Sequence, residues 1–190
     1  ENPNLIYLSI SAFGQNGPLG HRPGFDDVIQ ATSGFMSINE RGDGPIRTGG
    51  PVLDYATGMH STSAVLAAVL LRQQTGNGQR IDIAMQDVTM LLMNRHTCIA
   101  ASTGVAVPPG ANRDGPLLGR YLAKDGYVML AGYRANHQRS ILNAIGLTEF
   151  GSLSSAQLIS QMPQIEAKVE EVLQQKTEAE WEDRFRHSGE

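Results

Sequence analysis

The sequence predicts an α/β fold with parallel strands in its amino-terminal part, followed by the start of a smaller α+β domain. In the first part, strand-like runs at 5–10 and 80–85 are separated by a long helical run of small and apolar residues. Strands that alternate with helices across short loops are typical of a parallel α/β layer. Beyond residue 118, one strand-like run is followed only by helical patterns, which favours an α+β arrangement.

The first two elements are predicted from local residue types. The run at 5–10 is apolar and rich in β-forming residues, and the turn residues of 14–18 end it. A short helix is predicted over 26–34, because Asp26 and Asp27 favour the start of their own helix.

A long helix is then predicted from about Tyr55 to Gln74, and the glycines at 76 and 78 close it. The run at 80–85 alternates polar and apolar residues, as a half-buried strand does. A further helix is expected to start near Gln86.

The pattern of residue types along the chain changes after a segment rich in proline and glycine. We interpret this segment as a linker. In the part that follows, a strand is predicted at 127–131 and helices at 136–145 and 165–176. The residues from Thr177 have the form of a capping box, and the helix that they start should bury Trp181 and Phe185. The predicted organisation is a large domain over 1–102, a linker over 103–118 and a small domain over 119–190.

Composition excludes several classes of protein. The 190 residues carry a formal net charge of -4 without a cluster of Lys and Arg, so neither nucleic acid nor an anionic membrane surface is expected as a partner. No apolar run approaches the ~20 residues of a membrane span. The single cysteine, Cys98, suits a reducing cytoplasm, and no residues show the spacing of a metal site. The chain does not begin with Met, and we expect it to be the central portion of a longer protein.

Asp54 is the strongest candidate for a catalytic residue. It lies near the amino end of the predicted long helix, in the run Pro51-Val-Leu-Asp54-Tyr-Ala-Thr-Gly58. Free N–H groups and the helix dipole favour a negative charge there, and an ionised carboxylate with open space in front of it can act as a covalent nucleophile. The simpler alternative is that Asp54 only caps its helix.

Four motifs, in this order, resemble those of the family III CoA-transferases. They are Ser9-Ile-Ser-Ala-Phe-Gly14-Gln-Asn-Gly-Pro18, Arg22-Pro-Gly-Phe-Asp26, Asp54-Tyr-Ala-Thr-Gly58, and Thr75-Gly76-Asn-Gly78-Gln79 leading into Met85-Gln-Asp87. The resemblance implies a large Rossmann-like domain, a smaller domain and a homodimer of interlocked chains. It also implies an enzyme that moves CoA between an acyl-CoA and a small carboxylic acid, with no permanently bound cofactor.

The resemblance also assigns roles to individual residues. Asp54 would attack the thioester and carry the covalent intermediate. The segment of Arg22, Pro23, Gly24 and Phe25 would lie along the CoA arm, and Met85 would pack near the base or the pantetheine of CoA. Backbone N–H groups at the helix start or in the turn before it are candidate donors to the oxyanions that develop.

Two other functions remain open. The same resemblance includes α-methylacyl-CoA racemases, which need bases on both faces of the substrate carbon. In those relatives a His precedes the residue that corresponds to Asp26, whereas this chain has Phe25, which cannot exchange a proton; His21 could substitute for it. The chain could also be a non-catalytic module for acyl-CoA binding or dimerisation. His60 is interpreted as structural, because its spacing from Asp54 places it on another face of the helix.

Overall fold

The computed structural model describes residues 2–39, 44–105, 113–115 and 117–188. They form two compact units, Glu1–Ala111 and Asn112–Glu190, called here the first and the second unit. Residues 106–112 and 116, which belong to the predicted linker, lie outside the described residues. Throughout the described part of the chain, the helices are too short or too polar to cross a membrane.

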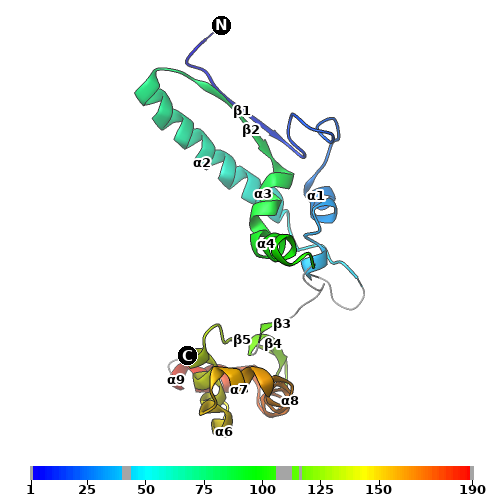
Figure 1. The fold of residues 1–190 in the computed structure, drawn as a ribbon, viewed down its shortest axis with the longest axis vertical. Helices are drawn as coiled ribbons and strands as arrows, with labels where there is room; N and C mark the ends of the chain where they lie inside the picture. Colours follow the sequence, from blue (N-terminus) through cyan, green and yellow to red (C-terminus); the bar gives the residue numbers. More distant parts are fainter. Residues whose placement is uncertain (1, 40–43, 106–112, 116, 189–190) are drawn as a thin grey trace. The chain divides into compact units, whose positions relative to one another are not determined.

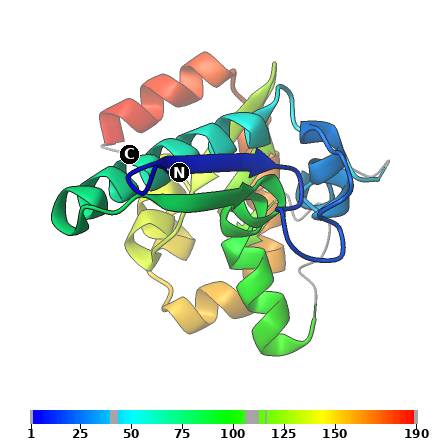
Figure 2. The same ribbon diagram turned by 90° about the horizontal axis from the view of Figure 1, so that it is seen from above.

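The first unit contains two parallel strands and the helices that connect and follow them. Between β1 (Ile6–Ser11) and β2 (Gln79–Ala84), the chain forms α1 (Asp26–Thr32), the 3-10 turn η1 (Ser37–Asn39) and the long helix α2 (Val52–Thr75) (Figure 1). After β2 come α3 (Met85–Leu92) and α4 (Asn94–Thr103). The strands pair in parallel along their whole length, and α2 runs alongside them (Figure 2). The predicted parallel strands are confirmed, while the Rossmann-like arrangement stays a prediction.

Helix α2 begins at Val52, three residues earlier than expected, and this places Asp54 in its first turn. The residue before the helix is Pro51, which has no side-chain acceptor to offer the free N–H groups. At the other end, Gly76 adopts φ 74° and donates its N–H to the carbonyl of Arg72, as expected for a glycine that closes a helix.

The buried core of the first unit is small. Its apolar cluster consists of the buried residues Ala12, Ile29, Leu53 and Met85, with Phe13, Phe35 and Val52 packed against them. This core lies where α1, the start of α2 and the start of α3 meet, so it supports the first turn of α2 directly.

The second unit combines an antiparallel sheet with helices. Its strands have the order β3-β4-β5, with bounds Arg113–Gly115, Leu118–Leu122 and Tyr127–Ala131. Five helices follow in the described residues: α5 (Ala135–Ala144), α6 (Thr148–Gly151), α7 (Ser155–Ser160), α8 (Met162–Leu173) and α9 (Glu178–Ser188). Strand β5 coincides with the predicted strand, whereas α6 and α7 were not expected.

The core of the second unit includes Trp181, which is 2% exposed and whose indole Nε1 donates to the carbonyl of Leu173 at 2.8 Å. That carbonyl ends α8 and has no partner within its own helix, so the indole supplies the missing donor. Phe185 is half-buried, packs against the same core and stacks on Trp181, so the predicted burial is confirmed for Trp181 and only in part for Phe185.

Candidate active site

Asp54 is the third residue of α2 and is exposed to solvent. Its carboxylate makes no hydrogen bond or ion pair with any other described residue. It is not the N-cap of the helix, because Pro51 holds that position and no side chain of the helix's own start caps it. The carboxylate is therefore open to a ligand.

The acceptor that caps α2 comes from α1. Asp26 is 4% exposed, and its Oδ2 accepts hydrogen bonds from the backbone N–H groups of Leu53 at 2.7 Å and Asp54 at 3.3 Å. Asp26 lies in the first turn of its own helix, as predicted, and its side chain also caps α2, which was not expected. Its neighbour Asp27 is exposed and pairs with Arg47.

Gln30 extends this contact to the loop before α2. The side chain is fully buried; its Nε2 donates to Oδ1 of Asp26, and its Oε1 accepts the N–H of Thr48 at 2.9 Å. A chain of hydrogen bonds thus links the loop that precedes α2, helix α1 and the first turn of α2. Sequence reasoning missed Gln30; a glutamine four residues after an acidic residue on a helix was the available signal.

The backbone N–H groups in the first turn of α2 are all occupied in this structure. That of Val52 donates to Gly50 and that of Tyr55 to Pro51, at 3.0 and 3.2 Å, while Asp26 accepts the two between them. These groups are therefore not free to bind an oxyanion. The N–H groups of 49 and 50 make no hydrogen bond with another described residue, and they remain the candidate donors in this region.

The segment expected along the CoA arm is largely accessible. Arg22 and Pro23 are exposed, and Phe25 is 81% exposed. Arg22 donates its backbone N–H to Leu19, and its guanidinium has no partner among the described residues. Gly24 is half-buried, and a Cβ atom there would lie 2.9 Å from the Cβ of Ala12, so this position requires glycine.

Met85 lies at the start of α3 and is 8% exposed. It belongs to the small core of the first unit together with Leu53, the residue before Asp54. These contacts are those of an ordinary core methionine, and through Leu53 they support the turn that carries Asp54.

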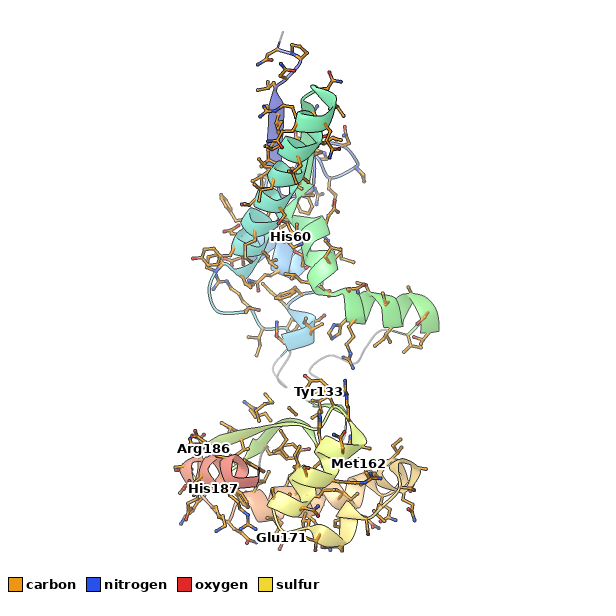
Figure 3. The ribbon with its side chains drawn as sticks, turned by 90° about the vertical axis from the view of Figure 1, so that its left-hand side faces the viewer. His60, Tyr133, Met162, Glu171, Arg186 and His187 are labelled. Atoms are coloured by element: carbon orange, nitrogen blue, oxygen red, sulfur yellow. The ribbon has the colours of Figure 1, made fainter. Side chains whose placement is uncertain are left out.

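The histidines near the site are not brought together with Asp54 by any contact in the described residues. His60 is labelled on α2 in Figure 3, and its Nδ1 lies 2.9 Å from the carbonyl oxygen of Ala56, one turn earlier in the same helix. His21 is exposed. Among the described residues, no three His, Cys, Asp or Glu side chains are close enough to hold a metal ion.

The chain is similar to several known proteins. The succinate–glutarate CoA-transferase of Agrobacterium fabrum is 36% identical over 151 residues, which cover 77% of this chain and 37% of that protein. The acetyl-CoA:oxalate CoA-transferase of Acetobacter aceti is 40% identical over 114 residues, covering 59% of this chain and 29% of that protein.

Solved structures agree with these similarities. A hypothetical protein from Mycobacterium tuberculosis superposes with a TM-score of 0.82 at 27% identity, and a CAIB/BAIF family protein from Brucella suis with 0.76 at 26%. Both matches cover 99% of this chain, which spans about half the length of those proteins, 52% and 51%. The family model described as CoA-transferase family III matches residues 1–189, and the chain therefore belongs to this family.

Proposed function

We propose that the complete protein carrying this chain is a CoA-transferase that moves CoA from an acyl-CoA to a carboxylic acid through a covalent intermediate on Asp54. One observation carries this proposal. The Asp54 carboxylate is exposed and unpaired among the described residues, in the first turn of a helix that a second carboxylate, Asp26, already caps. Asp54 is thus not needed as a cap and is available for chemistry.

The reaction begins with a carboxylate oxygen of Asp54 attacking the thioester carbonyl. The carbon–sulfur bond breaks, CoA leaves as a thiolate, and an anhydride forms between Asp54 and the acyl group. The thiolate then attacks the aspartyl carbonyl, which releases the donor acid as a carboxylate and leaves CoA on Asp54 as a thioester.

The acceptor acid reverses these steps. Its carboxylate attacks the aspartyl thioester and displaces the thiolate, and the thiolate attacks the acceptor side of the new anhydride. The new acyl-CoA leaves, and Asp54 returns to a free carboxylate. No proton or electron is gained or lost overall, so the route needs neither a metal nor a redox cofactor.

One feature of the surroundings of Asp54 supports this proposal. Arg22 and Phe25 are exposed on the segment that ends at Asp26, and Asp26 contacts the N–H of Asp54, so this segment leads directly to the nucleophile. Water must be excluded during transfer, or the intermediate would hydrolyse. Because Asp54 is exposed here, that exclusion would come from the substrates or from other parts of the complete protein.

The remaining expectations follow from the family resemblance and from composition. We propose Arg22, Pro23, Gly24 and Phe25 as CoA contacts and Met85 as packing near the CoA base or pantetheine. The complete protein would be a homodimer, and its exposed single cysteine, Cys98, suits a reducing cytoplasm.

Trapping of the intermediate tests the proposal. The complete protein is incubated with a donor acyl-CoA and quenched with hydroxylamine, which converts an activated aspartyl group into a hydroxamate. The hydroxamate should appear on Asp54 in the peptide mass spectrum. Asp54→Ala should reduce turnover by about 10⁴-fold or more while the protein stays folded, a scale typical of a removed nucleophile.

Asp27→Asn provides the matched control, because Asp27 is also an exposed aspartate but pairs with Arg47. This variant should keep both turnover and labelling of Asp54. Full turnover in the Asp54→Ala variant, or turnover of the unchanged protein without any label on Asp54, would exclude the covalent route.

A further inference from the structure

We propose that Asp26 is a positioning residue for Asp54, and that it acts through a hydrogen-bond relay from the N–H of Thr48 through Gln30 into the first turn of α2. The inference rests on the proposed function, in which Asp54 is the nucleophile. It concerns how that nucleophile is held, and it assigns a role to two buried side chains, Asp26 and Gln30, that the covalent route does not itself use.

The donor-to-acceptor direction of the relay is fixed by the backbone N–H group at which the relay begins. The N–H of Thr48 can only donate, so Gln30 must turn its Oε1 toward it. The Nε2 of Gln30 then faces Asp26 and can only donate as well. Oδ1 of Asp26 must therefore be an acceptor.

The other oxygen of Asp26 is an acceptor for the same kind of reason. Two backbone N–H groups, those of Leu53 and Asp54, point at Oδ2. Both oxygens of Asp26 therefore accept hydrogen bonds, as those of a carboxylate can. An asparagine at this position would place a donor against a donor, because its NH₂ group cannot accept.

Burial makes this requirement costly to violate. Asp26 is 4% exposed and Gln30 is fully buried, so water cannot replace a lost partner. The negative charge is stabilised by three donors and by the amino end of α2, a helix of 24 residues. The carboxylate of Asp26, fixed at this point, holds the backbone of Asp54 in place. The carboxylate of Asp54 stays free to face the substrate.

A pair of substitutions tests the relay, because its direction can be reversed. Asp26→Asn keeps the size of the side chain but turns an NH₂ group toward Nε2 of Gln30. Adding Gln30→Glu restores every hydrogen bond. The introduced carboxylate would accept from Thr48 and from the introduced amide, whose oxygen would accept from Leu53 and Asp54. The double variant moves the charge one helical turn away and keeps the total charge unchanged.

We expect Asp26→Asn in the complete protein to lower kcat by about 10–100-fold, the cost of a misplaced reacting group, with KM for the acyl-CoA nearly unchanged. Hydrogen exchange of the N–H groups of Leu53 and Asp54 should become faster. The double variant should recover most of the lost kcat and the slow exchange. Asp27→Asn, which alters a neighbouring aspartate on the solvent side, should change neither quantity.

The outcomes separate this proposal from the proposed function. If the unchanged protein turns over without acylating Asp54, the covalent route fails whatever the Asp26 variants do. If Asp54 is acylated, and its rate of acylation in the Asp26→Asn variant equals that in the unchanged protein, only the positioning role is overturned. A folded double variant that stays as slow as Asp26→Asn overturns the relay, and one that is fast supports it even where Asp26→Asn alone does not fold.

Discussion

Asp26 accepts the backbone N–H of Asp54 at 3.3 Å, although 28 residues separate the two along the chain. This contact joins two motifs that the sequence shows apart, the segment ending at Asp26 and the segment beginning at Asp54. Phe25 is the residue immediately before the cap and is 81% exposed, so the position beside the buried carboxylate carries an accessible group without acid–base chemistry.

Phe25 leads to a prediction about the racemase alternative. Racemisation needs a base on each face of the substrate carbon, and Phe25 supplies none, while both oxygens of Asp26 are occupied. We expect that a branched acyl-CoA incubated with the complete protein in heavy water, without an acceptor acid, takes up no deuterium at the α-carbon. Mass spectrometry of the recovered acyl-CoA measures this. Uptake that disappears in a His21→Ala variant would instead identify His21 as a base and favour a racemase.

A second prediction concerns Gly24 and its contact with Ala12. A Cβ at position 24 would lie 2.9 Å from the Cβ of Ala12, and neither atom can move without the backbone. Gly24→Ala should therefore destabilise the first unit by about 1–3 kcal/mol, as overpacking does. Gly58→Ala is the control, because a Cβ there meets nothing within 4 Å. Urea unfolding should show a lower free energy of unfolding for Gly24→Ala than for the unchanged protein. A free energy of unfolding for Gly58→Ala that equals or exceeds that of the unchanged protein would confirm that the loss at Gly24 comes from overpacking.

How much of the site the sequence predicts depends on the range of each interaction. The parallel strands and the long helix were predicted because patterns of neighbouring residues determine them. The cap of α2 was missed because its acceptor, Asp26, belongs to another helix. A signal was present, since Pro51 offers no side-chain acceptor and a helix that starts there needs one from elsewhere. Helices α6 and α7 have four and six residues, too few to show a helical period.

A third prediction tests the bond between Trp181 and Leu173 in the second unit. Trp181→Phe keeps an aromatic ring in the core but leaves the carbonyl of Leu173 without its donor, in a region where both residues are at most 2% exposed. The free energy of unfolding should fall by about 1–3 kcal/mol, the cost of a buried unsatisfied group. Tyr133→Phe is the control, because Tyr133, labelled in Figure 3, is 74% exposed. Circular dichroism can follow unfolding in both variants, and equal stability of the two would contradict the role of the indole N–H.

A fourth prediction concerns Glu180 and the dependence of stability on pH. The backbone N–H and the hydroxyl of Thr177 donate to Glu180 Oε2 at 2.8 and 3.0 Å, and these hydrogen bonds lower the pKa of Glu180 below its ordinary value of 4.5. A carboxylate whose pKa is lower in the folded state binds fewer protons there than in the unfolded state. The stabilisation is therefore fully present above the ordinary value and is lost as the pH falls through the lowered one.

Glu180→Gln removes the charge and keeps an oxygen that can accept from Thr177. The unchanged protein should exceed this variant in free energy of unfolding at about pH 7, and the difference should shrink as the pH is lowered toward about 2. Glu171→Gln controls for the loss of one surface carboxylate, because Glu171 is exposed and makes no hydrogen bond with another described residue. A difference for Glu180→Gln that persists unchanged at acid pH would mean that the ionised carboxylate is not the stabilising species, and that the shape of the capping box alone holds the start of α9.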